Sequence, residues 1–273
     1  MKMYCLLLLL VLFGKTEASS FGLLNPEKIH SSKKETLMEY LEDFPVKNYR
    51  VYHTKQPGYF YVDAVDDTIK DTLKRKEAWQ PFLHKYISLY ALPGSTVVDV
   101  GAHVGTYTAV MARAVKDGRV VAIEPQPKLF RELVMNMALN QAINVDFYWA
   151  GAGSRVGEIE LSPLASRNEG STPLAGGTGM YVDLITIDSL NLKNVSFIKI
   201  DAVSMENEIL DGARETIAKS KPVIVVEIMG EFSYETATSE IKSRIDETIK
   251  KLHSFGYTTH RVSPHDYLAL PIK

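Results

Sequence analysis

The sequence predicts a doubly wound α/β fold with a mostly parallel sheet and a C-terminal antiparallel hairpin. From about residue 96, short β-branched apolar runs alternate with segments of helical periodicity. The runs contain few polar residues, as expected for parallel strands that helices cover on both faces. After the last helical segment, two strand-like segments flank residues 263–266, and this arrangement predicts the closing hairpin.

Residues 19–95 are expected to form a lead-in, a hairpin and a helix that pack on this core. A short helix is expected around residues 36–43. Alternating, tyrosine-rich residues at 49–65 predict the hairpin. Residues 67–92 are predicted to form one helix. The apolar stripe of this helix recurs at helical spacing and is expected to be core: Trp79, Leu83, Tyr86 and Ile87.

Residues 96–273 are expected to form the main domain. Its core strands are predicted at residues 97–100, 120–123, 145–149, 195–200 and 223–228. Its helices are predicted at residues 106–116, 127–140, 204–218 and 236–254, and its hairpin at 257–262 and 267–271. Residues 162–179, rich in Gly, Ser, Pro and Thr, interrupt this alternation. Such a long connection is expected to be either a lid or a disordered loop.

The turn after the first core strand is the most informative segment. Asp99 ends the strand, Gly101 and Gly105 are four residues apart, and a helix begins at Thr106. Such a turn lets backbone N–H groups approach a nucleotide-like ligand. A dinucleotide fingerprint needs glycine where His103 stands, and a phosphate loop needs Gly-Lys. The pattern therefore favours a ligand without a pyrophosphate, such as S-adenosylmethionine (SAM).

The second core strand ends in Glu124, followed by Pro125. An acid at this position can accept hydrogen bonds from both ribose hydroxyls, although Asp99 and Glu124 could instead only cap loops. His103 could contact the cofactor or act as a base, or simply tolerate the backbone of the turn as Asn does. The residues predicted to contact the cofactor are Asp99, Gly101, His103, Gly105, Thr106, Glu124, Pro125 and Ala150.

Several further motifs follow in order: VDVGAHVG at 98–105, EPQP at 124–127, LVMN at 133–136, TIDSL at 186–190, IKID at 198–201, ILDGA at 209–213 and PVIVVE at 222–227. With them the chain resembles the FkbM methyltransferases over roughly residues 60–270. The resemblance implies a SAM-dependent methyltransferase with a Rossmann-like fold, usually acting on oxygen. Members of the family usually have Asn in place of His103. They also carry D-V-E-G-x-E where residues 201–206 read D-A-V-S-M-E.

Three acids near the carboxyl edge of the predicted sheet are the candidate catalytic residues: Asp201 at the end of a strand, Glu206 one turn into the following helix, and Glu227 late in the next strand. Adjacent strands would bring them together, and like charges in a partly dry crevice raise one another's pKa. One of them could then remove the proton of an acceptor hydroxyl. The same trio could hold a divalent cation. In the structural alternative, Asp201 and Glu206 only stabilise the start of a helix.

Residues 1–18 have the pattern of a secretory signal peptide, with Lys2, an apolar run from residue 3 to 13, and Ala18. The run is too short for a membrane span, so none is expected after cleavage. Cys5, the only cysteine, would leave with the peptide, which excludes disulfides and thiol chemistry. Asn194 begins a glycosylation sequon, and we expect the protein in the secretory lumen or secreted.

Two functions of different classes remain open. The first is O-methylation of a sugar or another small polar hydroxyl acceptor in the secretory pathway. The second is a non-catalytic binding module that keeps the methyltransferase fold, because the segment 201–206 is altered. A nicotinamide oxidoreductase is a more distant third. The net charge of −2 argues against a nucleic-acid partner. The oligomeric state is not predicted.

Overall fold

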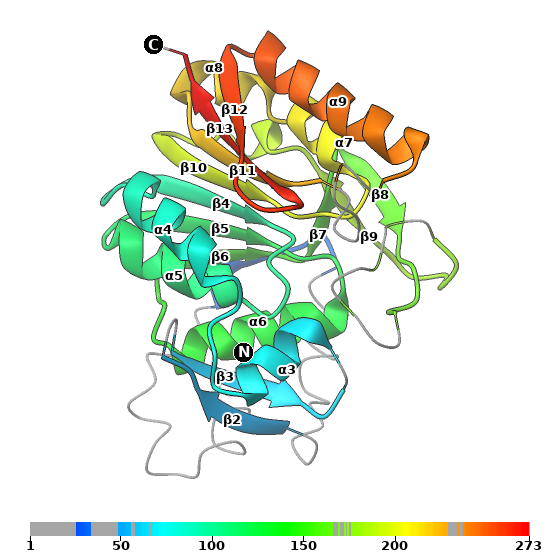
Figure 1. The fold of residues 1–273 in the computed structure, drawn as a ribbon. Coiled ribbons are helices and arrows are strands. Elements are labelled where there is room, and N and C mark those ends of the chain that lie inside the picture. The colour runs from blue at the N-terminus through cyan, green and yellow to red at the C-terminus, as the bar shows by residue number, and fades with distance from the viewer. Residues whose placement is uncertain are drawn as a thin grey trace.

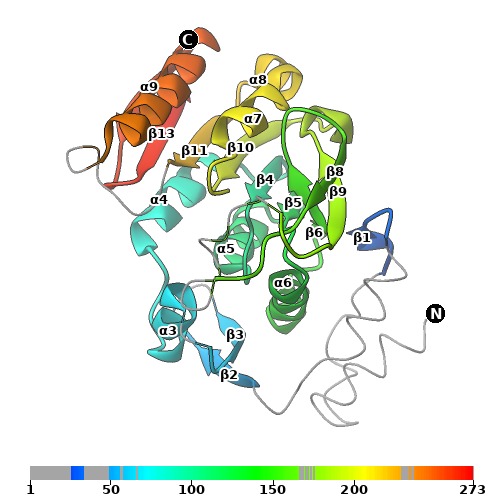
Figure 2. The ribbon, with the colours of Figure 1, turned by 90° about the vertical axis from the view of Figure 1, so that its right-hand side faces the viewer.

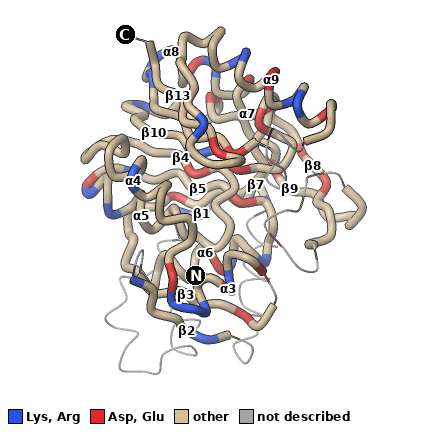
Figure 3. The backbone as a smooth tube through the Cα atoms, viewed as in Figure 1, with Lys and Arg blue, Asp and Glu red and all other residues tan. Residues whose placement is uncertain are grey.

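The computed structural model describes residues 26–33, 49–55, 58–65, 67–165, 169, 172, 174, 176–228, 234 and 237–272. The expected signal peptide (1–18) and the helix expected at 36–43 lie outside the described residues. The described chain forms a central sheet of eight strands, a smaller sheet of three strands, and an N-terminal hairpin (Figure 1). Lys and Arg are interspersed with Asp and Glu along it (Figure 3).

The central sheet has the strand order β1 (Ile29–His30), β6 (Val145–Tyr148), β5 (Arg119–Ile123), β4 (Thr96–Val100), β10 (Val195–Ile200), β11 (Val223–Glu227), β13 (Asp266–Pro271) and β12 (Tyr257–Arg261). All neighbours are parallel except β13, which is antiparallel to both β11 and β12. This arrangement confirms the predicted doubly wound fold with its C-terminal hairpin. The order reverses between β4 and β10, where such sheets open a crevice for ligands.

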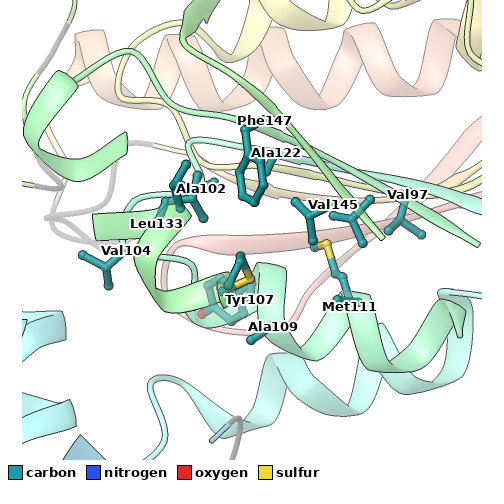
Figure 4. Packing of buried hydrophobic residues seen from close by; sticks show 14 of the residues in the cluster. Val97, Ala102, Val104, Tyr107, Ala109, Met111, Ala122, Leu133, Val145 and Phe147 are labelled. Atoms are coloured by element: carbon teal, nitrogen blue, oxygen red, sulfur yellow. The ribbon is translucent and has the colours of Figure 1, made fainter. Parts of the chain in front are cut away.

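Helices cover both faces of this sheet (Figure 2). One face carries α4 (Pro81–Tyr90), α5 (Thr106–Val115) and α6 (Pro127–Leu139), and the other carries α7 (Glu206–Asp211), α8 (Arg214–Ser220) and α9 (Ser239–Ser254). Alternate strand residues point to opposite faces. Thus Val97 packs with Met111 and Val145 in the hydrophobic core on the α5 and α6 face (Figure 4), whereas Val98 packs in the core on the α7 and α9 face.

Two predicted helices are each divided in two. The helix expected at 67–92 is α3 (Thr68–Lys74) followed by α4, because Lys76 and Gln80 have φ of 64° and 35° and no helix continues through such residues. The helix expected at 204–218 is α7 followed by α8. The break lies at Gly212, where a Cβ atom would stand 2.0 Å from the carbonyl oxygen of Gly153. Close packing therefore overrides helical periodicity at this point.

The smaller sheet was not predicted from the sequence. Its order is β7 (Ala150–Ala152), β9 (Tyr181–Ile185) and β8 (Gly157–Glu160), and β9 is parallel to β7 and antiparallel to β8. β7 therefore belongs to the smaller sheet and not to the central one. The predicted N-terminal hairpin is present as β2 (Tyr49–His53) and β3 (Tyr59–Asp63).

A buried lysine attaches the N-terminal part of the chain to the core. The Nζ atom of Lys70 in α3 lies 3.0 Å from Asp63, 2.8 Å from Glu132 and 2.6 Å from Glu169. The Lys70 side chain is fully buried. The ammonium group needs these carboxylates because an unpaired buried charge is strongly unfavourable. Residues from α3, β3, α6 and the 162–179 segment are thereby held together.

Candidate active site

A cavity of about 650 Å³ lies at the carboxyl ends of the central strands. The ends of β4, β5, β10 and β11 form its floor, and β7 adds a side wall. Thr68 and Ile69 of α3, and the residues between α3 and α4, line it from the N-terminal part of the chain. Ligand pockets for small molecules have volumes of roughly 300–1,000 Å³, so this cavity is of suitable size.

The turn after β4 is pressed against the end of β10. Gly101 has a φ of +74°, and a Cβ atom there would lie 1.8 Å from the backbone oxygen of Asp201. The N–H groups of Gly101 and Ala102 both donate to the carbonyl of Ile123, at 3.0 Å each. These N–H groups are thus paired within the protein, and the expectation that they serve a ligand is not supported. Glycine is needed here for the close approach of two backbones.

Glu124 joins this turn to the cavity. One of its oxygens, Oε2, accepts the N–H of His103 at 2.9 Å, and Oε1 accepts the N–H of Gln126 at 2.9 Å. Burial raises the pKa of Glu124 to about 7. Each carboxylate oxygen has a second lone pair, so Glu124 can hold the turn and still accept hydroxyl groups from a ligand. It lines the cavity.

The predicted cofactor contacts divide into two groups. The structure places one group on the cavity wall: Gly101, His103, Glu124, Pro125 and Ala150. Asp99, Gly105 and Thr106 do not line the cavity. The Oδ2 atom of Asp99 accepts the hydroxyl of Thr108 at 2.6 Å, beneath the turn. Gly105 precedes α5 with a φ of +91° and faces the side chains of α6. These three residues shape the turn from below.

His103 occupies the left-handed region, with a φ of 51°. Histidine and asparagine enter this region more easily than most residues. The Nε2 atom lies 3.7 Å from Oδ2 of Asp67, and neither ring nitrogen has a hydrogen-bond partner among the described residues. Burial lowers the pKa of His103 to about 4, so the imidazole is neutral at physiological pH. The geometry therefore favours the backbone role of His103 over the role of a base.

All three candidate catalytic acids line the cavity, yet their surroundings differ. The Oδ2 atom of Asp201, whose side chain is 28% exposed, accepts a hydrogen bond from Lys199 Nζ at 2.9 Å. Glu227 stands beside Asp201, because Val226 and Ile200, the residues before the two acids, are partners in the register of β11 and β10. The charge of Asp201, followed by burial and the charge of Asp266, raises the pKa of Glu227 to about 9. At neutral pH Glu227 is therefore protonated and has Asp201 as its partner.

Glu206 is held differently. Its Oε2 atom accepts Arg244 Nη2 at 2.9 Å, and its Oε1 atom accepts the N–H of Ser204 at 3.3 Å. The ion pair joins the start of α7 to α9. Glu206 is thus engaged in an ion pair at the cavity wall, and Asp201 and Glu227 remain the candidate catalytic acids. Within the part of the chain that the structure describes, no three His, Cys, Asp or Glu residues are arranged to hold a metal ion.

Sequence reasoning missed Lys199, the buried cation that contacts Asp201. Its Nζ atom lies 3.5 Å from Asp99 Oδ1 and 4.8 Å from the centre of the Tyr107 ring, in addition to its contact with Asp201. The charges of Asp201 and Asp99 raise the pKa of Lys199 against the effect of burial. A lysine inside an otherwise apolar strand, Ile198-Lys199-Ile200, was the available signal.

Trp79 and Gln80 were also missed, because the sequence placed them inside a helix. Both line the cavity from the connection between α3 and α4. The Tyr107 hydroxyl donates to Gln80 Oε1 at 2.5 Å, and the same Tyr107 ring lies against Lys199. This chain of contacts places Gln80 at the Asp201 end of the cavity.

Residues in strained backbone conformations gather at the cavity. Gln80, His103 and Ser204 have φ of 35°, 51° and 64°, and all three line it. A non-glycine residue in the left-handed region costs free energy and persists only where the surrounding structure holds it. Such residues are concentrated at functional sites.

Comparison with known families identifies the chain. A model described as the methyltransferase FkbM domain matches residues 99–259, which is more than half of the sequence. The chain belongs to the FkbM methyltransferase family. A second model, described as protein-L-isoaspartate (D-aspartate) O-methyltransferase, matches residues 23–164. No curated protein matches the chain significantly.

Solved structures similar to this FkbM-family chain are distant. A methyltransferase FkbM from Methylobacillus flagellatus is 19% identical over 68% of this chain, with a TM-score of 0.44, and the chain spans only 50% of that protein. M. jannaschii TYW2 in complex with AdoMet is 16% identical, covering 81% and 83% of the two chains, with a TM-score of 0.43. Aeropyrum pernix fibrillarin with bound SAM is 13% identical, covering 84% and 85%, with a TM-score of 0.42.

The family assignment confirms the predicted enzyme class, a SAM-dependent methyltransferase, and its expected cofactor. The residues of this FkbM-family chain fit SAM. A buried carboxylate, Glu124, faces the cavity with lone pairs that suit ribose hydroxyls, and Ile123 and Leu129 beside it offer apolar surface for a base. Ser204, at the position where the family signature has glycine, keeps the left-handed backbone that glycine favours.

Proposed function

We propose that the chain transfers the methyl group of SAM to a hydroxyl group of a sugar or another small polar acceptor in the secretory pathway. The observation that carries this proposal is the position of Asp201. Its backbone oxygen lies beside Gly101 of the turn, and the residue lines the same cavity as Trp79 and Gln80. A carboxylate in this cavity can remove the acceptor proton while the methyl group is transferred.

Glu124, Ile123, Leu129 and Ala150 would hold the nucleoside part of SAM, since they line the β5 and β7 side of the cavity. When bound, SAM supplies a methyl group that is already activated by the positive sulfur. The protein then has to align the acceptor and exclude water. Alignment of two reacting groups can supply roughly 7–11 kcal/mol of the barrier reduction.

Asp201 would act as the general base and contribute about 10²–10⁴-fold to the rate. Lys199 fixes one of its oxygens by a hydrogen bond of 2.9 Å. In the protein without a bound donor, Glu227 holds a proton at neutral pH. Glu206 supports the loop that carries Asp201 by pairing with Arg244.

The lining of the Asp201 end favours an uncharged acceptor with several hydroxyl groups. The half-buried Trp79 offers an aromatic face, on which the apolar face of a sugar ring can pack. Gln80 uses its Oε1 atom toward Tyr107 and keeps two amide N–H groups as donors. The carboxylate of Asp201 would repel carboxylate or phosphate groups on an acceptor.

The secretory location is part of the proposal and rests on the pattern of residues 1–18 and on the sequon at Asn194. The side chain of Asn194 is exposed at the start of β10. No helix in the described residues is long and apolar enough to cross a bilayer. Microscopy of the protein with a C-terminal tag tests the location: a lumenal pattern is expected, and a cytosolic pattern would contradict it.

A non-catalytic binding module is the second candidate, because Val203 stands where the family signature has glutamate. Two measurements separate the candidates. The purified full chain is titrated with SAM by calorimetry, and is then incubated with methyl-labelled SAM and a panel of neutral sugars, acidic sugars and small polyols. We expect micromolar binding and label on a neutral sugar or polyol. SAM binding without transfer of label to any member of the panel would favour the binding module. Absence of SAM binding would contradict both candidate functions.

A further inference from the structure

Asp201 and Glu227 stand side by side at the carboxyl ends of two adjacent strands, and both line the cavity. Strands β10 and β11 are parallel, and Ile200 pairs with Val226 in their register. The residue that follows each of these two partners is one of the two acids. Neighbouring like charges in a largely buried place disfavour each other's ionisation, so the second acid of the pair keeps its proton to a higher pH.

The charges around the pair explain why it keeps this proton. Lys199 is the cation that contacts Asp201, and its Nζ atom also lies near Asp99 below the turn. Asp266 of β13, which is 2% exposed, is the register partner of Glu227 and adds a negative charge. On the α9 side, Arg244 is paired with Glu206.

His265 of the β12–β13 connection also lines the cavity, and the phenol of Tyr107 is turned toward Gln80. Among these surrounding residues, Lys199 is the cation that contacts Asp201, and its ammonium group also lies near Asp99. A second ionised acid beside Asp201 would leave the local charge strongly negative. Protonation of Glu227 removes that excess.

Resting on the proposed function, we propose that Glu227 is the proton-storing partner of the base Asp201, and that the pair releases this proton when the positively charged methyl donor occupies the cavity. The donor brings one positive charge, which replaces the proton as the compensating charge. The pair is then a dicarboxylate only while a methyl group is available for transfer.

The proton balance closes over one reaction cycle. Transfer forms a C–O bond on the acceptor and breaks the C–S bond of the donor, whose electron pair stays on sulfur. The acceptor hydroxyl loses its proton to the Asp201–Glu227 pair, and this restores the singly protonated state. The product S-adenosylhomocysteine (SAH) is uncharged at sulfur, so the protonated pair is also the form that accommodates it. No oxidant, reductant or metal is needed.

Coulomb's law gives the size of the effect. A unit positive charge about 6 Å from the pair, at an effective dielectric constant of about 20, lowers its pKa by about 2. The pKa of Glu227 is about 9 in the free protein. At pH 8 the pair would therefore be mostly protonated without the donor and mostly ionised with it. Binding of SAM should release about 0.8 protons from the pair, and binding of SAH about none.

Calorimetric titration in buffers of different ionisation enthalpy measures these protons directly. The full chain is titrated at pH 8 with SAM and with SAH, as wild type, as Glu227→Gln, and as Glu247→Gln, a control on the exposed face of α9. The wild-type and Glu227→Gln counts are subtracted, because ionisation of the ligand itself contributes to both. We expect a difference of about 0.8 protons for SAM and about none for SAH, with the control equal to wild type.

Equal proton counts in wild type and Glu227→Gln for both ligands would overturn this inference and leave the proposed function standing. Failure of SAM and SAH to bind the wild type would overturn both. A second measurement uses only the wild-type protein and does not depend on the folding of a variant. In the wild type, the preference for SAM over SAH should increase at least about tenfold from pH 7 to pH 9. A preference that stays constant over this range would contradict the inference.

Discussion

The Nζ atom of Lys199 lies 2.9 Å from Oδ2 of Asp201 and joins the candidate base to the glycine turn. The same ammonium group lies 3.5 Å from Oδ1 of Asp99 and 3.5 Å from the backbone oxygen of Gly101. One buried cation therefore fixes both the catalytic side of the cavity and the floor of the cofactor side. Removal of this cation should affect stability as well as chemistry.

Lys199→Met should lower the free energy of unfolding by about 3–5 kcal/mol, because it leaves Asp99 buried without its cation. Urea denaturation at pH 7 measures this loss. Lys193→Met is the matched control, since Lys193 is exposed just before β10 and should change stability by at most about 0.5 kcal/mol. Equal effects of the two substitutions would show that Lys199 has no central role.

Gly101→Ala and Gly94→Ala distinguish two reasons for glycine: the lack of room for a Cβ atom and the left-handed backbone conformation. Both glycines have similar φ values, +74° and +75°, but only Gly101 has a neighbour, Asp201, in the place of a Cβ atom. Gly94→Ala should cost about 1–2 kcal/mol from backbone strain alone. Gly101→Ala should cost clearly more and weaken SAM binding. Thermal unfolding and calorimetry measure both effects, and equal losses in the two variants would contradict the close packing.

Asp201→Ala should reduce methyl transfer by about 10²–10⁴-fold, because it removes the base that accepts the hydroxyl proton. The dissociation constant of SAM should change by less than about tenfold, or about 1.4 kcal/mol. Single-turnover transfer and calorimetry measure the two quantities. Wild-type transfer rates in this variant would eliminate Asp201 as the base.

Glu206→Gln should behave in the opposite way. It breaks the ion pair with Arg244, in which Glu206 is 1% and Arg244 is 30% exposed, and should lower stability by about 1–3 kcal/mol. The folded variant should keep transfer within about tenfold of wild type, since Glu206 is not expected to take a proton. Chemical denaturation and transfer assays below the unfolding temperature give both values. A large loss of transfer at unchanged stability would return Glu206 to the catalytic residues.

Stability should also depend on pH through Glu227. Its pKa is raised from 4.5 to about 9 in the folded protein, so the folded state holds a proton that the unfolded state has lost. Between these values, each rise in pH favours unfolding. The melting temperature of the wild type should therefore fall relative to that of Glu227→Gln from pH 5 to pH 9. A constant difference over this range would show that Glu227 is ionised in the folded protein.

The fold and the cofactor side follow from local sequence patterns. Runs such as residues 97–100 and 120–123 are nearly all apolar, and only a strand buried on both faces explains them. Glu124 directly follows the second run, and parallel strands bring such ends to one edge of the sheet. The place of Glu124 on the cavity wall could therefore be predicted without knowledge of tertiary contacts. Asp99, inside the first run, is paired with Thr108 and does not line the cavity.

The rest depends on contacts between segments far apart in the sequence. Gln80 lies in the break between α3 and α4, with a φ of 35°, and its side chain accepts a hydrogen bond from Tyr107, a contact that no local sequence signal reports. Glu206 has the spacing of a catalytic acid but is paired with Arg244, which lies 38 residues later. The strands β8 and β9 are too polar and half-exposed to stand out. Three-dimensional neighbours decide the role of each of these residues.

A crystal structure of the full chain grown with SAH tests the central claim most directly, namely that the cavity beside Glu124 binds the methyl donor. We expect density within this cavity, with the ribose hydroxyls within hydrogen-bond distance of the Glu124 carboxylate and the sulfur on the Asp201 side. Density at another place on the protein, or an empty cavity at a saturating SAH concentration, would contradict the assignment of this site.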